Sequence, residues 1–420
     1  MNTINKITSF SQYNSFNILE NNDSSGRNIR YMLLKDICII GRNTFYPNCL
    51  LWNNNLKELI SPYNEKIMSL NKDSFYDNNE YDISKDNLNN SKKIYSTPVY
   101  FFIYNFDNYY HFIYDTIPYL ITYFKLKKNI PELKLVVSYP NPSKNTFYKF
   151  NEDIFNIFNI QNDIIIHEDN TIYSSIYIGN SLTHDGMSNT YPHTEVYKLF
   201  NNISITNEVK QFPKKIYISR RTWINNDKSN LGTDYTQKRK LMNEDLLVEK
   251  LREKGFEEIF CENLSMNEKI QLFKNAEVII GAIGGGMCNL IFSPPKTNVI
   301  CIVSPYFLDI NNRFRFSMEH TNIEYIYDTK VSSEINRYPL FVRVKIIDKN
   351  NLYYNKIGEI INIEEDIDNY SIQISNNDVA GFNNLINFEK IKFNKDQFEL
   401  LDNGLNSPYE VNIFKVLENI

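Results

Sequence analysis

A histidine and an aspartate lie four residues apart in the stretch NYYHFIYDTIPYL, as His111 and Asp115. If the stretch is helical, this spacing places both side chains on one face, which the neighbouring aromatic residues make partly apolar. A carboxylate in such surroundings can have its pKa raised and act as a general base, and a histidine beside it can orient it or contact a phosphate. A purely structural His–Asp pair is the simpler alternative. We assign Asp115 as the candidate base, with His111 beside it.

Arginines gather around a polar loop in the second half of the chain. Arg220 and Arg221 end the strand-like run KKIYIS, and Arg239 follows the loop. Ligands of parallel sheets bind at the carboxyl ends of the strands, and a guanidinium group suits bidentate contact with phosphate. For each arginine taken singly, a solvated surface charge is the simpler interpretation. Together they indicate a candidate anion site.

A glycine-rich turn lies in the stretch Val278–Pro295, which reads VIIGAIGGGMCNLIFSPP. A β-branched run leads into Gly284, Gly285 and Gly286, and a short apolar segment follows, which predicts a strand, a turn and the start of a helix. Glycines allow the backbone to approach a ligand, and the N–H groups at a helix N-terminus attract anions such as phosphate. A tight turn without a ligand is the alternative.

Three polar residues near these groups have a structural explanation as well as a ligand-binding one. Asn243 and Glu244 can be the N-cap and the first-turn acid of a helix, and Asn289 can lie on the outer side of a short helix. The candidate ligand-binding residues are Arg220, Arg221, Arg239, Asn243, Glu244, Gly284, Gly285, Gly286 and Asn289.

Two further motifs are interpreted as ordinary turns. His184, Asp185 and Gly186 follow a predicted strand, and Asp366 and Asp368 form a DxD pair in a polar hairpin. A DxD pair can hold a divalent cation, but in this position we interpret it as solvated and predict no metal site. The glycine turn does not fit the GxGxxG fingerprint of dinucleotide-binding proteins, so no dinucleotide cofactor is expected.

Alternating strands and helices surround these candidates, which predicts an α/β fold with parallel sheets. In the first half, strands are expected at 29–34, 37–40, 99–104, 133–139, 164–167 and 172–178, and helices at 109–120 and 147–158. Asp107 or Asn108 can cap the first helix, and Pro118 must kink or restart it.

The second half shows a clearer pattern. Strands are expected at 214–219, 256–261, 278–280 and 298–303, with helices at 244–255, from 266 and after the glycine turn. Ser265 and Glu268 form a capping box, and Gly255 ends the helix before it. This order of elements predicts a doubly wound sheet.

The region after Arg337 changes to short alternating strands without helices, which predicts a small all-β barrel. Its order of strands resembles that of SH3-like barrels, and a short amphipathic helix is expected after Asn406. The predicted domains are an α/β lobe at 1–205, a Rossmann-like lobe at 206–335, a small β-barrel domain at 336–403 and a tail at 404–420.

The composition argues against several classes of protein. The 420 residues carry a formal net charge of −5, so nothing indicates nucleic-acid binding. The five cysteines are scattered and lack a CxxC pair, which argues against a disulfide framework or a zinc site and fits a reducing compartment. The sequence shows no signal peptide and no apolar run of membrane-spanning length. We therefore expect a cytoplasmic protein and leave a peripheral contact with a membrane open.

Several of these segments together resemble the family 61 glycosyltransferases. They are NYYHFIYDTIPYL in the first half and KKIYISRR, KRKLMNEDLL, GFEEIF and MNEKIQLFKNAEVIIGAIGGGMCNLIFSPP in the second. Their order and spacing agree over residues 97–305. The family usually places a histidine directly before its glycine group, whereas this chain has Ile283 there.

The resemblance implies a GT-B fold, in which two Rossmann-like lobes flank a cleft. It implies transfer of a sugar from a nucleotide sugar, with a UDP-sugar as the first expectation, to a glycan or polysaccharide acceptor. The reaction would invert the sugar and need no metal or cofactor, with the diphosphate near the glycine turn and the arginines. Two other functions stay open: a binding module that has lost catalysis, which Ile283 favours, and a scaffold whose β barrel recruits partners.

Overall fold

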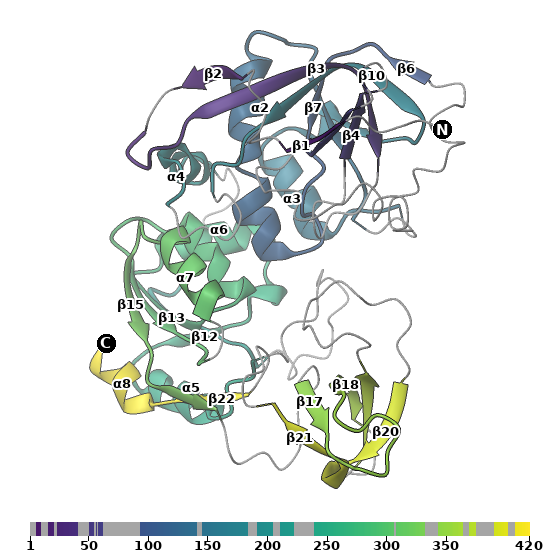
Figure 1. Cartoon of the computed structure of the whole chain (residues 1–420). Coiled ribbons are helices and arrows are strands. Elements are labelled where there is room, and N and C mark those ends of the chain that lie inside the picture. Colours follow the sequence, from purple (N-terminus) through teal and green to yellow (C-terminus); the bar gives the residue numbers. More distant parts are fainter. Residues whose placement is uncertain are drawn as a thin grey trace.

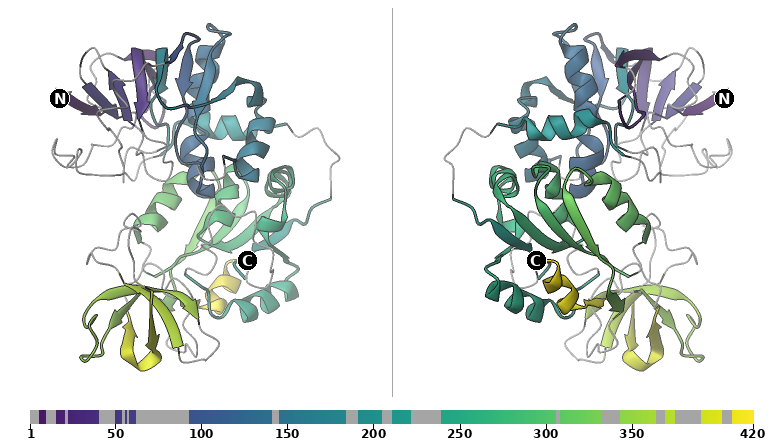
Figure 2. Two further views of the ribbon diagram at one scale, coloured as in Figure 1. Left: turned by 90° about the vertical axis from the view of Figure 1, so that its right-hand side faces the viewer. Right: turned by 90° about the vertical axis from the view of Figure 1, so that its left-hand side faces the viewer.

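The computed structural model consists of two lobes and a small β unit (Figure 1). It describes residues 6–9, 16–20, 23–40, 50–53, 56, 58–61, 93–140, 145–183, 191–204, 211–221, 239–305, 308–331, 343–363, 369–374, 390–401 and 408–420. We call the described residues before 205 the first lobe, those at 211–331 and 408–420 the second lobe, and those at 343–401 the small β unit. The second lobe lies between the other two parts (Figure 2).

A ten-stranded sheet in the order β1-β5-β4-β3-β10-β7-β8-β9 forms the first lobe, with β2 also paired to β3 and β6 to β10. Its strands are β1 (Lys6–Ser9), β2 (Asn17–Glu20), β3 (Ile29–Ile40), β4 (Leu50–Asn53), β5 (Glu58–Ser61), β6 (Lys93–Tyr95), β7 (Val99–Phe101), β8 (Lys134–Val137), β9 (Ile164–Ile166) and β10 (Thr171–Gly179). The strands β7 to β10 run parallel, as the alternating pattern predicts.

The long strand β3 pairs antiparallel with β10, so the sheet as a whole is mixed. The sequence predicts two separate strands here, but the structure has one. The polar residues Lys35 and Asp36 interrupt the apolar pattern because they are exposed on the surface of the strand. Asp36 also has a φ of 54°, so the strand is locally irregular without ending.

The helix that carries His111 and Asp115 stops at Pro118 and restarts, which is one of the two predicted alternatives. The first-lobe helices are η2 (His111–Thr116), α2 (Tyr119–Lys127), α3 (Lys149–Ile157), η3 (Gln161–Asp163) and α4 (Thr194–Asn201), of which α4 was not predicted. The Asn108 side chain accepts a hydrogen bond from the His111 backbone N–H at 3.3 Å and so caps the start. The element η2 is a π-helix, a rare form that is frequent at functional sites.

The second lobe has a fully parallel sheet in the order β12-β11-β13-β14-β15. Its elements are β11 (Lys215–Ile218), α5 (Glu244–Glu253), β12 (Glu257–Ile259), η5 (Cys261–Asn263), α6 (Met266–Asn275), β13 (Val278–Ala282), η6 (Gly285–Phe292), β14 (Asn298–Ile302), α7 (Leu308–Ser317) and β15 (Asn322–Ile326). The doubly wound pattern is confirmed, and α7 and β15 extend it beyond the predicted elements. The strand order reverses between β11 and β13, and ligands bind such sheets at the carboxyl ends of these strands.

A continuous hydrophobic core joins the two lobes. It contains buried side chains from β7, β8 and α2 of the first lobe and from α6, η6 and β14 of the second. Phe200 of α4 meets Phe292 of η6 with ring centroids 5.5 Å apart. Lys274 Nζ donates to the carbonyl oxygens of Asn201 and Ile203 at 3.0 and 2.6 Å. The first lobe is therefore packed firmly against the second.

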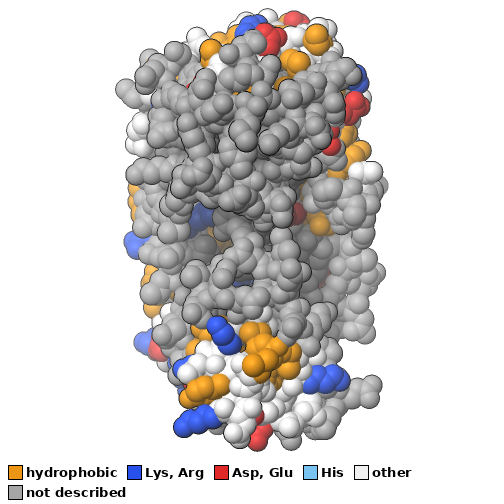
Figure 3. All heavy atoms as spheres, turned by 45° about the vertical axis from the view of Figure 1, so that its right-hand side comes forward, with side chains coloured by type: hydrophobic (Ala, Val, Ile, Leu, Met, Phe, Trp, Pro, Cys, Tyr) orange, Lys and Arg blue, Asp and Glu red, His pale blue; other side chains and the backbone are white. Residues whose placement is uncertain are grey.

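The small β unit is an antiparallel sheet in the order β20-β19-β18-β17-β21 with a core of its own. Its elements are β17 (Arg343–Ile346), β18 (Ile357–Ile363), β19 (Asn369–Ile374), β20 (Lys390–Asn394), η7 (Lys395–Gln397) and β21 (Phe398–Leu400). This sheet confirms the predicted β region, whereas the likeness to SH3-like barrels stays a prediction. On its surface, Ile347, Leu352 and Tyr354 are exposed close in sequence to Lys349 and Lys356. Figure 3 shows hydrophobic side chains next to Lys or Arg side chains at the lower end of the molecule, where the small β unit lies.

The C-terminal residues return to the second lobe. The strand β16 (Thr329–Val331) precedes the small β unit, and β22 (Tyr409–Val411) follows it and pairs antiparallel with β16. The predicted tail helix is α8 (Ile413–Glu418), whose Val416 is buried together with residues of β22 in the second-lobe core. The small β unit is thus inserted between two paired strands, while the exact domain boundaries stay predictions.

The capping box at the start of α6 provides a test of the local structure. Ser265 Oγ accepts from the Glu268 N–H at 3.3 Å, and Glu268 Oε2 accepts from the Ser265 N–H at 2.9 Å. We expect Ser265→Ala to lower the free energy of unfolding by about 1 kcal/mol, measured by urea denaturation. Ser265→Thr keeps the hydroxyl and serves as the control. An alanine variant as stable as the wild type would show that the cap contributes nothing.

Candidate active site

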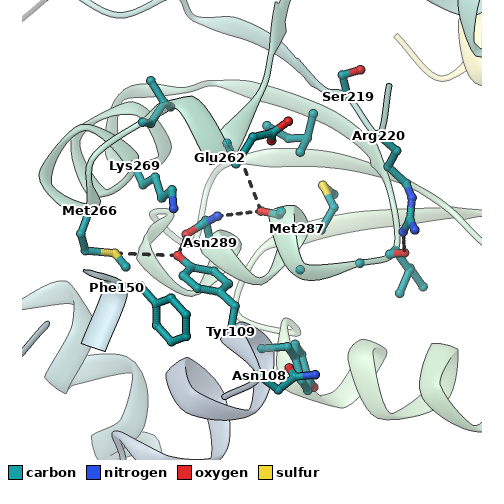
Figure 4. A pocket seen from close by; sticks show the side chains of 18 of the residues that line it. Asn108, Tyr109, Phe150, Ser219, Arg220, Glu262, Met266, Lys269, Met287 and Asn289 are labelled. Carbon is teal, nitrogen blue, oxygen red and sulfur yellow. Dashed lines mark hydrogen bonds between the residues drawn. The ribbon is translucent and has the colours of Figure 1, made fainter. Parts of the chain in front are cut away.

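A cavity of about 580 Å³ lies between the two lobes. This volume is in the range of ligand pockets. The first lobe contributes the start of η2 and the first turn of α3, and the second lobe contributes the ends of β11 and β13 with the segments that follow β12 and β13. Lining residues include His111, Phe150, Arg220, Lys269 and Gly285, several of which are shown in Figure 4.

The three glycines of the turn have different surroundings. A Cβ atom at Gly284 would collide with the Arg220 guanidinium, and one at Gly286 would lie 2.8 Å from Ile218 Cγ2. At Gly285 a Cβ atom would meet no other atom within 4 Å. Gly284 and Gly286 therefore make room for protein atoms, whereas the backbone of Gly285 faces open space at the start of η6. The first N–H groups of a helix have no partner within the helix and can bind an anion there.

The three predicted arginines point in different directions. Arg220 lines the cavity, and its Nη1 donates to the Ile283 carbonyl oxygen at 2.8 Å (Figure 4). Arg221 does not line it, because its guanidinium makes a two-fold contact with Glu258 at 2.8 and 2.6 Å. Arg239 is buried and lines the cavity. Two of the three arginines are therefore placed to meet a ligand.

Glu244 and Asn243 lie behind the cavity and do not line it. Glu244 Oε1 accepts hydrogen bonds from the Arg220 N–H at 2.8 Å and from the hydroxyls of Tyr217 and Ser219 at 2.9 and 3.2 Å. Burial raises the pKa of Glu244 despite these hydrogen bonds, which lower it. Glu244 thus fixes the backbone of Arg220. Asn243 occupies the N-cap position of α5, but its side chain makes no capping hydrogen bond.

Asn289 connects the glycine turn to the first lobe. It is fully buried and lines the cavity. Its Oδ1 accepts from the Tyr109 hydroxyl at 2.5 Å, and its Nδ2 donates to the Gly286 carbonyl oxygen at 2.8 Å (Figure 4). Both polar atoms of the amide are therefore used to hold the turn against the start of η2. Its predicted contact with a ligand stays a prediction.

His111 and Asp115 form a hydrogen-bonded pair whose histidine faces the cavity. His111 Nδ1 lies 2.6 Å from Asp115 Oδ2, and only His111 of the two lines the cavity. Asp115 is 8% exposed and also binds Arg313 of α7 at 2.5 Å. A carboxylate at Nδ1 selects the tautomer with a proton there, which makes Nε2 the nitrogen able to accept a proton. The His111–Asp115 pair of the first lobe is therefore linked to the second lobe through Arg313.

Six charged residues that line the cavity were not predicted, namely Lys149, Asp153, Glu262, Glu268, Lys269 and Arg313. Arg313 is partly buried. Burial works against its charge, but the neighbouring Asp115 outweighs this and raises the pKa of the guanidinium. Lys269 lies on α6 with its Nζ 4.8 Å from the centre of the Tyr109 ring, and burial lowers its pKa. Lys269 could have been found from the sequence, because it is one turn from Met266 on the predicted face of α6.

Some sequence-based interpretations fall outside the described residues. These are His184, Asp185, Gly186, Asp366, Asp368 and the polar loop before Arg239. Within the described part of the chain, no three side chains of His, Cys, Asp or Glu are grouped so as to hold a metal ion. In the same part, no helix combines the length and the apolar character needed to cross a membrane.

Residues 109–300 match the family model Glycosyltransferase 61. The chain contains a glycosyltransferase family 61 domain. The matched range begins at Tyr109, directly before η2, and ends in β14, so it includes both walls of the cavity. Arg313 lies beyond the end of the family 61 match, although it binds Asp115 within it. No curated protein matches the chain.

The contact between Asp115 and Arg313 can be tested by removing one charge. Arg313→Met leaves a buried carboxylate without its guanidinium partner, so we expect the free energy of unfolding to fall by about 3 kcal/mol. Denaturation with urea measures the change. The double variant Arg313→Met with Asp115→Asn removes both charges and should recover part of the loss. A double variant less stable than Arg313→Met alone would contradict this explanation.

Proposed function

We propose that this glycosyltransferase inverts the sugar that it transfers from a nucleotide sugar to a glycan acceptor, with a GT-B arrangement of its lobes and without an essential metal. The supporting observation is that one cavity between the lobes is lined both by the histidine of a His–Asp pair and by arginines and glycine backbone that suit an anion. Inversion requires a base on one side of the sugar and a stabilised leaving group on the other. The two walls of the cavity offer these two functions.

The anion site suits the diphosphate that leaves the sugar. The open backbone at Gly285, the start of η6 and the side chains of Arg220 and Arg239 all border the same space. Backbone N–H groups and guanidinium groups bind phosphate oxygens and stabilise negative charge as it develops. The Arg220 backbone N–H donates to Glu244, and its guanidinium donates to the Ile283 carbonyl oxygen. Family 61 glycosyltransferases usually have a histidine at the position of Ile283. We propose that Arg220 provides the positive charge there.

The geometry favours His111 over Asp115 as the base. Sequence reasoning assigned this role to Asp115, but its carboxylate is turned toward His111 Nδ1 and Arg313. We propose that His111 Nε2 accepts the proton of the acceptor hydroxyl while the oxygen of that hydroxyl bonds to C1 of the sugar. The bond from C1 to the diphosphate oxygen breaks in the same step, and the diphosphate leaves with the electron pair. Asp115 then stabilises the imidazolium that forms.

The nucleoside of the donor has a suitable position at the other end of the cavity. Tyr109 and Phe150 meet edge to face there with ring centroids 5.4 Å apart. Lys269 and Met266 lie on the opposite side of Asn289 from Arg220 (Figure 4). A planar base can pack on the aromatic rings, and the ammonium of Lys269 can donate to a base carbonyl. These features support the expectation of a UDP-sugar donor.

The neighbouring arginines allow a matched test of the donor site. We expect Arg220→Ala to weaken the binding of UDP at least about tenfold, because it removes a charge-assisted hydrogen bond to phosphate. Arg221→Ala is the control, since that side chain contacts Glu258 outside the cavity. Titration calorimetry measures both affinities. Equal affinities in the two variants would place the diphosphate elsewhere.

The assignment of the base can be tested through the dependence of the rate on pH. We expect His111→Ala to abolish transfer. We expect Asp115→Asn to leave a slow reaction whose acid limb, the fall in rate toward low pH, lies at lower pH than in the wild type. The shift follows because the imidazolium loses the carboxylate that stabilises it. Initial rates of sugar transfer between pH 5 and 9 measure the limb, with UDP affinity as the control for donor binding. A complete loss in Asp115→Asn with activity kept in His111→Ala would make Asp115 the base.

A further inference from the structure

We propose that the strand β22 (Tyr409–Val411) is a positioning element of the donor site, which holds Arg239 in the cavity through the backbone beside it. The inference depends on the proposed function, because that function gives Arg239 its role at the diphosphate. The strand follows the small β unit in the chain, and none of its residues lines the cavity. Its effect on the site must therefore pass through other residues.

Arg239 has a backbone conformation that needs support. Its φ of 55° lies in the left-handed region, which residues other than glycine adopt at a cost. Such conformations persist where the surrounding structure fixes them, and they cluster at functional sites. Arg239 is also 8% exposed and lines the cavity, so its side chain direction depends on this local geometry. The support should be visible in the residues that directly follow it.

The strand β22 binds the backbone directly after Arg239. The Tyr409 N–H donates to the Lys240 carbonyl oxygen at 2.9 Å, and the Tyr409 carbonyl oxygen accepts from the Met242 N–H at 2.8 Å. These two hydrogen bonds form a parallel bridge between Leu241 and Tyr409. The chain is thereby fixed at the first and the third residue after Arg239.

Asn243 adds a second pair of hydrogen bonds to the same strand. Its Nδ2 donates to the Val411 carbonyl oxygen at 2.8 Å, and its Oδ1 accepts from the Val411 N–H at 3.1 Å. The amide thus pairs with the backbone of β22 in place of capping α5. Asn243 was predicted to bind the ligand, whereas these contacts indicate that it acts indirectly, by helping to position Arg239.

The side chain of Tyr409 lies behind the cationic part of the cavity. It is 1% exposed, and burial raises the pKa of its hydroxyl to about 12. The charges of Arg220, Glu244 and Arg239 also act on that hydroxyl. The Tyr409 hydroxyl is therefore close enough to both arginines to be affected by their charges, although Tyr409 does not line the cavity.

The strand β22 is itself anchored at a second place. It pairs with β16, and Asn412 binds Asp328 through its backbone N–H at 2.9 Å and its side chain at 2.7 Å. This anchor does not touch residues 239–243. It provides a control, because a change there weakens the attachment of the strand without removing its contacts near Arg239.

A double-mutant cycle on the full-length protein tests the inference. Titration with UDP compares the wild type, Asn243→Ala, Arg239→Ala and the double variant. We expect each single variant to weaken binding about tenfold, the loss of one charge-assisted contact, and the double variant to bind no more weakly than Arg239→Ala alone. Asn412→Ala should lower the thermal midpoint and leave the affinity unchanged. An Asn243→Ala variant with wild-type affinity, or an additive effect in the double variant, would overturn the positioning role.

Amide hydrogen exchange separates this inference from the proposed function. Asn243→Ala should raise the exchange rate at residues 240–242, whether or not a nucleotide is present, and Asn412→Ala should not. Raised exchange together with no binding of UDP to the wild type would support the structural link and overturn the proposed donor site. Unchanged exchange in Asn243→Ala would overturn the link itself.

Discussion

The contact of Asp115 with Arg313 is the interaction on which the arrangement of the cavity depends. Both groups are largely buried, and each needs the other because an unpaired charge in the interior is costly. Asp115 belongs to the first lobe and Arg313 to the second, so their ion pair bridges the two lobes. Asp115 also fixes the ring of His111. The orientation of the histidine is therefore linked to the contact between the lobes.

Acidic residues near the second-lobe wall of the cavity are also bound to specific partners. Glu244 is directed at the backbone of Arg220 and two hydroxyls, and Glu258 is paired with Arg221 and Arg252 outside the cavity. Glu244 and Glu258 thus hold the framework. Five basic side chains line the cavity against three acidic ones, namely Lys149, Arg220, Arg239, Lys269 and Arg313 against Asp153, Glu262 and Glu268. A cavity lined in this way attracts an anion and disfavours a cation. The expected diphosphate is the kind of guest that this distribution of charge selects.

The sequence predicted the elements of the second lobe well where the signals are local. The capping box before α6, the glycine after α5 and the β-branched run of β13 each determine structure within a few residues. For Arg220 and Arg221, the sequence could also have indicated that the two side chains point in different directions. Successive residues of a strand point to opposite faces, so only one of the two arginines can face the ligand. The helix α7 gave no such signal, because its sequence lacks clear periodicity, and Arg313 was missed with it.

Long-range pairing explains the remaining differences from the sequence-based interpretation. Asn243 stands where an N-cap is expected, and its residue type suits that role, yet its amide binds a residue 168 positions away. The pairing of β3 with β10 and of β16 with β22 is similarly invisible in a local pattern. These contacts decide which predicted residues reach the cavity. The candidate residues were therefore found by type, but their roles could be separated only in three dimensions.

The path of the chain links the small β unit to the active site. The chain leaves the second lobe at β16 and returns at β22, and these strands lie side by side, so an inserted unit fits there without opening the parallel sheet. The return strand, however, also binds the backbone beside Arg239. A force that moves the small β unit relative to the lobe acts on β16 and β22, because these strands precede and follow the unit in the chain. An insertion at this place is thus connected to the cavity through β22, although β22 does not line the cavity.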